Sequence, residues 1–311
     1  MAKTKNKKIL VTDPVGSADN QVQPFQIEGM DVRGRAVRLG TEIDGILSTH
    51  NYPEPVSKLL GEVLAMAALL GSFLKFDGIM TIQTKGDGPV NMLVADYMSP
   101  GIIRGYARFD EAALNAAGEG VTSGALLGKG HMAMTIDQGK DMERYQGIVE
   151  LTGADISDAA KTYFISSEQL PTALRLAAGR DPVTNHWRAG GIMVQHLTRS
   201  EEGKERLDVE RTVEGSEDAW RRVTLLMETV KPDELMDRSL SLHDLLFRLY
   251  HEDGVRVFPS IPIKRGCRCS EDKIRDVIAT FSKDDIDHML EDDGMIRADC
   301  EFCGAVYEIK P

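Results

Sequence analysis

"GIMTIQTKGDGPVNMLVADY", residues 78–97, indicates the fold class of the chain. Two strand-like runs flank the segment "KGDGP", in which Gly86, Gly88 and Pro89 suit a tight turn. The stretch is therefore predicted to form two neighbouring strands joined by a hairpin. The same glycines could suggest a phosphate-binding loop, but a hairpin turn is the better interpretation because no helix follows them.

The segments on both sides of the hairpin continue this mixture of strands and helices. The apolar segment 56–76 is predicted to be a core helix, because Lys58, Glu62 and Lys75 fit a core helix better than a membrane span. Strands in neighbouring runs, with helices interspersed, favour an α+β fold over a doubly wound parallel sheet. A helix interrupted near Pro171 is predicted over 155–179. Further strands are predicted at 32–40, 102–110, 131–139, 144–151 and 189–197. These elements define an N-terminal core domain of mixed sheet and helix, residues 1–198.

Residues 199–259 form a highly charged segment that also contains two amphipathic helical patterns. The first pattern places one apolar face along 216–230, and the second does so along 241–253, where Ser241 and Asp244 resemble a capping box. Two interpretations stay open for this helical linker. The helices could be docked permanently on the core, or they could form a metastable linker that is apolar enough to dock and charged enough to survive undocked. The predicted apolar positions are Trp220, Val223, Met227 and Val230 in the first helix and Leu242, Leu245, Leu246 and Leu249 in the second.

The remaining segment, residues 260–311, holds all four cysteines of the chain. Cys267 and Cys269 form a C-x-C pair, and Cys300 and Cys303 form a C-x-x-C pair followed by glycine. Four thiolates can occupy the tetrahedral corners of one closed zinc site, and a unit of this size needs such a staple. His288 could replace one sulfur, but it lies among acidic residues on a predicted helix and is expected to face solvent. The site could be only structural, or it could also sense oxidants, because zinc thiolates stay nucleophilic and a C-x-C disulfide is strained.

The composition excludes several classes of function. A net charge of −12 disfavours nucleic acid and anionic membranes as partners. Without a secretory signal the expected compartment is the cytoplasm, where thiols are kept reduced. No enzyme is predicted: four cysteines close a zinc site, the histidines form no H-E-x-x-H pattern, and "CEFC" precedes a strand-like run rather than a helix. A zinc module that binds a protein partner remains an alternative.

Several blocks of the sequence resemble the redox-regulated heat-shock chaperones of the thirty-three-kilodalton class. The C-terminal blocks "CRCS", "DVIATFSKDDIDHMLEDDG" and "CEFCGAVYEI" are similar to the zinc-binding end of that family. Blocks such as "YFISSEQLPTALRLAAG", "AGGIMVQ" and "LFRLYHEDGVRVF" occur in the family's order. The residues before about Asp31 and residues 199–218 match the family poorly.

The resemblance implies an ATP-independent holdase of the cytoplasm that prevents aggregation during oxidative and heat stress. The reduced form would bind one zinc ion through all four cysteines and be inactive. Oxidation would expel zinc, form the disulfides Cys267–Cys269 and Cys300–Cys303, and unfold the zinc-binding redox-switch domain and then the linker. The active form would be a homodimer that binds unfolding client proteins and passes them to ATP-driven foldases.

Overall fold

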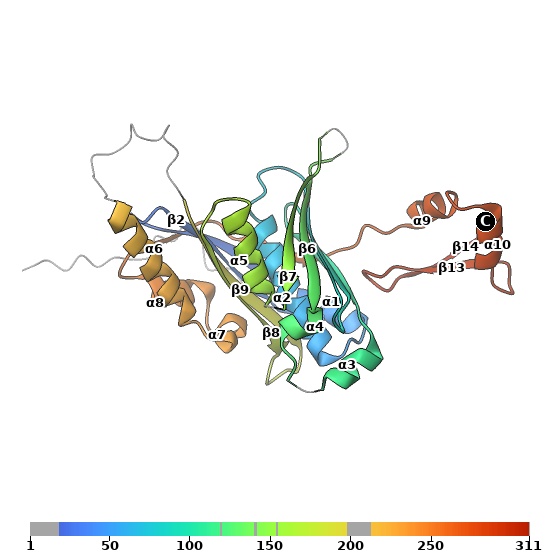
Figure 1. The fold of residues 1–311 in the computed structure, drawn as a ribbon, viewed down its shortest axis with the longest axis horizontal. Helices are drawn as coiled ribbons and strands as arrows, with labels where there is room; N and C mark the ends of the chain where they lie inside the picture. Colours follow the sequence, from blue (N-terminus) through green and yellow to red (C-terminus); the bar gives the residue numbers. More distant parts are fainter. Residues whose placement is uncertain (1–18, 119, 140–141, 154, 198–212, 311) are drawn as a thin grey trace, which may run out of the picture.

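The computed structural model describes residues 19–118, 120–139, 142–153, 155–197 and 213–310. Its core consists of two sheets that pack against opposite sides of one long helix, α2 (Glu54–Gly71) (Figure 1). Pro53 and Pro55 suit the start of this helix, and nearly every side chain from Val56 to Leu70 is buried. The sequence-based prediction of a core helix is thus confirmed. In the described part of the chain, no helix is both long and apolar enough to cross a membrane.

The first sheet is antiparallel and has the strand order β10-β1-β2-β9-β8, with β11 paired to the start of β1. Side chains alternate between its two faces, so Val37 and Leu39 of β2 pack toward α2, whereas Val32 and Ala36 point the other way. Both faces of this sheet are therefore buried. Its strands are β1 (Gln21–Ile27), β2 (Val32–Leu39), β8 (Thr172–Arg180), β9 (Trp187–His196), β10 (Val255–Val257) and β11 (Ile261–Pro262).

The second sheet has the strand order β12-β5-β4-β3-β6-β7 and contains the predicted hairpin. Strands β3 and β4 pair from Ile79 with Met98 to Lys85 with Met92, and the amide of Gly86 donates to the carbonyl of Asn91 at 3.2 Å. A Cβ on Gly88 would lie 2.4 Å from the carbonyl oxygen of Leu126, so the turn requires glycine there. The strands are β3 (Ile79–Gly86), β4 (Met92–Met98), β5 (Ile102–Arg108), β6 (Lys129–Asp137), β7 (Tyr145–Thr152) and β12 (Lys264–Arg265).

One predicted element of the core is wrong in its second half. The expected helix over 155–179 ends early, as α5 (Ile156–Ser166), and the residues after Pro171 form β8 instead. That segment is rich in Ala, Leu and Arg, which favour helices, but pairing with β9 along its whole length overrides this preference. The other helices of the core are α1 (Thr41–Thr49), α3 (Glu111–Ala117) and α4 (Ser123–Leu127).

Three helices of the predicted linker cover the outer face of the first sheet: α6 (Val213–Glu228), α7 (Pro232–Met236) and α8 (Leu242–Tyr250) (Figure 1). The predicted apolar faces of α6 and α8 are buried here, and Ser241 caps α8 by accepting a hydrogen bond from the amide of Asp244. They pack on Phe25, Ile27 and other side chains of the sheet. Residues 199–212 of the predicted linker lie outside the described residues.

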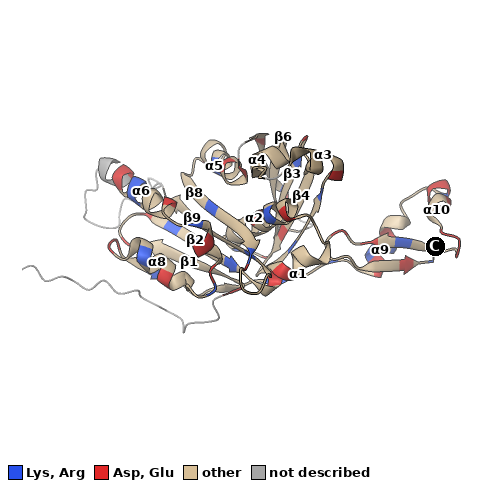
Figure 2. Ribbon diagram, turned by 90° about the horizontal axis from the view of Figure 1, so that it is seen from below, with Lys and Arg blue, Asp and Glu red and all other residues tan. Residues whose placement is uncertain are grey.

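A small terminal unit projects from the core (Figures 1 and 2). The four cysteines lie where this unit meets the core, because Cys267 Sγ is 3.8 Å from Arg104 of β5 and 3.6 Å from Cys300 Sγ. The unit's own core is small, with only Ile278, Ile296 and Ile309 fully packed. Two helices are present in this unit, with Ser270 and Ser282 as their N-caps. The elements are α9 (Glu271–Ile278), α10 (Lys283–Met289), β13 (Ile296–Asp299) and β14 (Val306–Ile309).

A continuous strap, residues 255–265, connects the linker to the cysteines. Within it β10 and β11 pair with β1 of the first sheet, and β12 pairs in parallel with β5 of the second. The strap thus hydrogen-bonds to both sheets of the core. The division of the chain into domains 1–198, 199–259 and 260–311 stays a prediction.

Candidate metal centre

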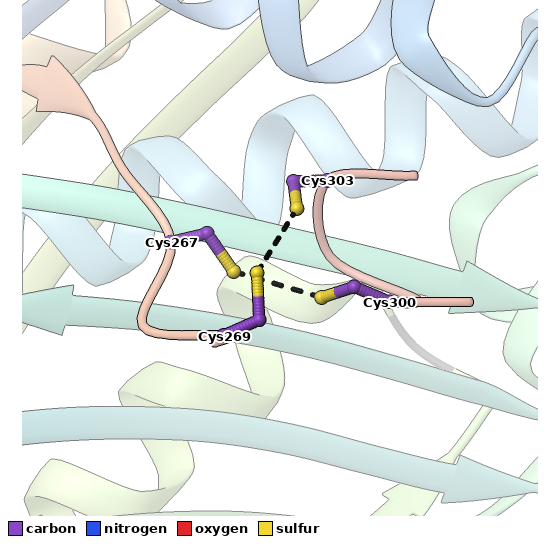
Figure 3. Close-up of side chains that lie close together, drawn as sticks. All are labelled: Cys267, Cys269, Cys300 and Cys303. Atoms are coloured by element: carbon purple, nitrogen blue, oxygen red, sulfur yellow. Dashed lines mark hydrogen bonds between the residues drawn. The ribbon is translucent and has the colours of Figure 1, made fainter. Parts of the chain in front are cut away.

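The four cysteine side chains converge on one point (Figure 3). All four sulfur atoms lie within 4.8 Å of one another, with Cys267 Sγ 3.6 Å from Cys300 Sγ and Cys269 Sγ 3.4 Å from Cys303 Sγ. Four sulfurs bound tetrahedrally at ~2.3 Å from zinc would be about 3.8 Å apart. The spacing in the structure therefore fits a tetrahedral thiolate site, with no backbone rearrangement required.

Two short loops present these sulfurs. Cys267 and Cys269 follow β12, which is anchored because the amide of Gly266 donates to the carbonyl of Ile103 at 3.1 Å. Cys300 and Cys303 lie in the turn between β13 and β14. In that turn the amide of Gly304 donates to the carbonyl of Cys300 at 2.8 Å, and Gly304 has a positive φ of 68° that favours glycine. The glycine of the C-x-x-C-G pattern is thus needed for the turn.

The protein environment gives the thiols different acidities. Burial opposes ionisation of Cys267, but hydrogen bonds from the Cys269 backbone, the Cys269 and Cys300 thiols and Arg104 outweigh it and lower the pKa of Cys267 to about 6. Burial raises the pKa of Cys300, and burial together with the neighbouring thiols raises the pKa of Cys303 to about 12. The protein alone therefore favours one thiolate in the cluster, and a bound cation would be needed to hold several.

Residues outside the cysteine loops contact the sulfurs directly. The hydroxyl of Tyr307 donates to Cys269 Sγ at 3.1 Å, and Arg104 Nη1 lies 3.8 Å from Cys267 Sγ. Tyr307 belongs to β14 of the terminal unit, whereas Arg104 belongs to β5 of the core. Such contacts orient metal ligands and stabilise their charged forms.

The C-x-x-C turn also docks on the core through the two residues between its cysteines. The ring of Phe302 packs edge-on against Tyr106 at 4.8 Å between centroids, and the guanidinium of Arg104 lies 3.8 Å from the centre of the Phe302 ring. Glu301 forms a two-pronged ion pair with Arg108, with the shorter contact at 2.8 Å. The turn that carries two of the sulfurs is thus the same turn that contacts β5.

The donor set is the one that zinc prefers in closed structural sites. Cys267, Cys269, Cys300 and Cys303 would hold the ion, and no fifth ligand is close to them among the described residues. His288 is exposed, and its Nδ1 lies 2.6 Å from the carbonyl oxygen of Asp284, away from the cluster. The sequence-based expectation that His288 faces solvent agrees with this position.

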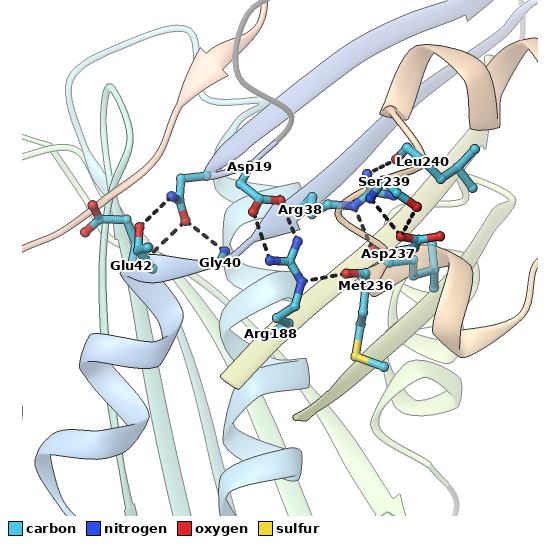
Figure 4. A network of polar contacts seen from close by, with 12 residues as sticks. Asp19, Arg38, Gly40, Glu42, Arg188, Met236, Asp237, Ser239 and Leu240 are labelled. Carbon is cyan, nitrogen blue, oxygen red and sulfur yellow. Dashed lines mark hydrogen bonds and ion pairs between the residues drawn. The ribbon is translucent and has the colours of Figure 1, made fainter. Parts of the chain in front are cut away.

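A second polar cluster holds the linker on the core (Figure 4). Arg38 of β2 is fully buried and donates to three backbone carbonyls of the linker, those of Glu234, Leu235 and Leu240. Arg188 of β9 donates to the carbonyl of Met236 at 2.6 Å and pairs with Asp19 at 2.6 Å. We call Arg38 and Arg188 the arginine clamp. The clamp holds α7 and the loop that follows it.

Sequence analysis identified the four cysteines but not the residues that surround them. Arg108 meets Glu301 across 193 residues of the chain, and Arg38 meets the carbonyl of Leu235 across 197 residues. No local signal in the sequence announces such contacts. The one available hint was the aromatic residue inside "CEFC", because an apolar ring in a tight exposed turn needs a surface to cover it.

The chain is similar to known proteins over nearly its whole length. The family model described as "Hsp33 protein" matches residues 20–310. A 33 kDa chaperonin of Caulobacter vibrioides is 45% identical over 97% of this chain and 98% of its own length, and one of Pseudomonas paraeruginosa is 37% identical over 94% and 92%. The crystal structure of the 33 kDa chaperonin (heat shock protein 33 homolog) of Thermotoga maritima has a TM-score of 0.75 at 22% identity, covering 94% of this chain and 95% of that one.

The chain belongs to the Hsp33 family of chaperones. The match begins at residue 20, so the prediction that the residues before Asp31 have no counterpart in the family is wrong in part. Gln21–Ile27 of this stretch form β1, whose strand pattern is interrupted by Pro24 and is therefore weak in the sequence.

Proposed function

We propose that the chain is an ATP-independent holdase whose activity is controlled by the oxidation state of Cys267, Cys269, Cys300 and Cys303. The convergence of the four sulfurs at the junction of the terminal unit and the core carries this proposal. In the reduced form one zinc ion bound by the four thiolates would supply the tetrahedral centre that the small terminal core lacks. Zinc contributes on the order of 10 kcal/mol of folding free energy to domains of this size.

Oxidation would convert the four ligands into two disulfides. For each disulfide, two thiols lose two electrons and two protons, and one molecule of hydrogen peroxide is reduced to two molecules of water. We propose the pairs Cys267–Cys269 and Cys300–Cys303, in keeping with the family resemblance. The shortest sulfur contacts run between the two loops instead, so the pairing is a matter for experiment. Disulfide sulfurs are poor zinc ligands, and the ion would be released.

Loss of the ion would affect the linker in two stages. The terminal unit would first lose its fold and its contacts between Phe302, Arg104 and Tyr106. The linker helices would then leave the outer face of the first sheet and expose its apolar side chains to unfolding proteins. These side chains include Phe25, Ile27, Ile192 and Val194, and the helices would contribute Val223, Met227, Leu245 and Leu249.

Further parts of the proposal follow the same reasoning. The exposed surfaces would favour association into a homodimer, and clients would pass to ATP-driven foldases once reducing conditions return. The protein would work in the cytoplasm as a chaperone rather than an enzyme, with neither nucleic acid nor membrane as partner. The sequence contains no P-loop pattern, which supports independence from ATP.

The test measures zinc content and suppression of client aggregation on the same samples before and after oxidation. The reduced chain should hold one zinc ion and leave a heat-unfolding client unprotected, whereas peroxide at mildly elevated temperature should release the ion and switch suppression on. Peptide mapping of the oxidised sample identifies the disulfide pairs. Equal suppression by both samples would refute redox control, and switching in a chain with all four cysteines changed to serine would refute the site.

A further inference from the structure

Two like charges lie close together beside the cavity between the two sheets, next to α5, and one of them, Arg33, is among the lining residues of the cavity. Arg33 and Arg35 of β2 both lie over the ring of Phe73, with guanidinium carbons 4.7 and 4.1 Å from its centre. Within the described residues neither guanidinium forms an ion pair with a carboxylate. Burial and the charge of Arg33 lower the pKa of Arg35 to about 10, so both side chains remain cationic at neutral pH. Two like charges are thus held together without an anion.

The hydrogen bonds of these arginines are incomplete. Arg33 donates from Nε and Nη2 to the amide oxygen of Gln195, which leaves Nη1 without an acceptor in the described part of the chain. Arg35 donates from Nη1 to the carbonyl of Gly34, while its buried Nε has no partner. Arg35 Nε is the one buried side-chain nitrogen or oxygen of the described residues in this condition. Unsatisfied buried donors of this kind are rare, and each calls for a physical explanation.

The cavity that Arg33 lines has a volume of about 610 Å³, within the range of small-molecule sites. The polar groups opposite, Tyr145 and Tyr163, are engaged with Glu168, to which their hydroxyls donate at 2.5 and 2.7 Å. Of the two cations that line the cavity, Lys75 is exposed and Arg33 is half-buried, so Arg33 is the cation placed to select a ligand inside the cavity. The apolar lining consists of Leu70, Phe73, Leu74, Phe76, Met80 and Ile136, with Phe164 and Leu170 from the α5 side.

We propose that this cavity binds an apolar chain that ends in a carboxylate, such as a medium-chain fatty acid. The carboxylate would accept hydrogen bonds from Nη1 and Nη2 of Arg33, in the planar two-pronged geometry that guanidinium groups favour. The alkyl chain would lie along Phe73 and the other apolar residues of the cavity. Binding an anion there would also relieve the repulsion between Arg33 and Arg35.

The position of the cavity separates it from the proposed redox switch. Arg33 and Arg35 point toward α2 and the second sheet, whereas the linker helices cover the opposite face of β2. Undocking of the linker would leave the cavity walls in place. We therefore expect the same ligand affinity in the reduced and the oxidised chain.

The experiment titrates the reduced full-length chain with decanoate, decanol and decylamine by calorimetry, well below the concentrations at which they form micelles. Decanoate should bind with one-to-one stoichiometry and about ten-fold more tightly than decanol, equivalent to about 1.4 kcal/mol, and decylamine should bind least. Equal affinities for decanoate and decanol, or binding of decanoate only after oxidation, would overturn the proposal. This comparison uses the unaltered protein and does not depend on the folding of any variant.

Two variants locate the carboxylate. Arg33→Gln should reduce the affinity for decanoate to that for decanol and leave the affinity for decanol unchanged. Lys75→Gln is the matched control, because Lys75 also lines the cavity and carries the same charge but is exposed to solvent. An equal loss in both variants would indicate general attraction of anions and would overturn the assignment to Arg33.

Discussion

Arg38→Met should release the linker helices without any oxidation. The Arg38 side chain is fully buried and donates to the carbonyls of Glu234 at 2.9 Å and Leu235 at 3.1 Å, and also to that of Leu240. Methionine has a similar length and keeps the apolar contacts, but it leaves these carbonyls without donors. The change therefore tests whether the clamp holds the linker.

The size of the effect follows from the three hydrogen bonds. A buried polar group that loses its partner costs about 1–3 kcal/mol. Burying a guanidinium is itself unfavourable, and removing that charge recovers part of the loss. We expect the docked linker to lose about 3–5 kcal/mol, within the range for breaking buried charged contacts. At 1.4 kcal/mol per factor of ten, the undocked population should rise roughly a hundred- to four-thousand-fold.

Hydrogen exchange of the amides in α7 and α8 measures this population directly. In reduced, zinc-loaded Arg38→Met, these amides should exchange faster by the stated factor, amides of α2 should be unaffected, and the chain should suppress aggregation without peroxide. Arg35→Met is the matched control, because Arg35 lies on the same strand but points away from the linker. Exchange rates in α7 and α8 of Arg38→Met that equal those of the wild type would refute the role of the clamp.

Three further predictions concern other contacts. Phe302→Ala should keep all four thiols and one zinc ion but remove about 1–3 kcal/mol of aromatic and cation–π contact with β5. Zinc release by peroxide should therefore be about ten-fold faster in this variant. Glu301→Gln, which removes an exposed ion pair, should have little effect on the rate. Burial and the charge of Asp155, opposed by Lys58, raise the pKa of Glu62 to about 7. The folded chain therefore holds a proton that the unfolded chain loses, and the free energy of unfolding falls as pH rises from about 4.5 to 7. Glu62→Gln should increase the free energy of unfolding at pH 8 by at most about 3 kcal/mol, seen as a higher melting temperature, and by much less at pH 5. Burial, opposed by Asp244, lowers the pKa of His243, whose Nε2 lies 3.0 Å from Gln23 Oε1. The undocked linker therefore takes up the proton more readily, and the protection of α8 amides relative to their intrinsic exchange rates should fall as pH drops below about 6.5 in the wild type but not in His243→Gln.

The sequence was most informative where function depends on residues that are close together in the chain. The C-x-C and C-x-x-C-G spacings identified the cysteines that cluster in the fold, and the turn residues of "KGDGP" identified the hairpin. The helix predicted over 155–179 was half wrong, because the composition of 172–179 favours a helix and only the partner strand β9 reveals a strand. The helix preference of single residues is weak compared with the stabilisation gained from pairing in a sheet.

Contacts between distant residues could not be predicted in this way. Arg33, Arg35 and Arg38 occur in one alternating strand and look alike in the sequence, yet two share the ring of Phe73 and the third binds linker carbonyls. Their roles are determined by which face of β2 each residue occupies and by what covers that face. Only the folded chain supplies this second piece of information.

The energies of the contacts explain why oxidation and heat would act together. The terminal unit is held on β5 by one aromatic pair, one cation–π contact and one exposed ion pair, together worth about 1–4 kcal/mol. The linker is held by the buried apolar faces of α6 and α8 and by the arginine clamp, and the strap between them hydrogen-bonds to both sheets. Loss of the contacts between the terminal unit and β5 would therefore not be enough to undock the linker. The apolar gain of the docked helices is, however, largely offset by the entropy lost on ordering them, and this term grows with temperature. At elevated temperature, a small loss of stabilising free energy at the cysteines would then be enough to undock the linker. Zinc release should therefore precede undocking of the linker, and the time between the two events should shorten as temperature rises.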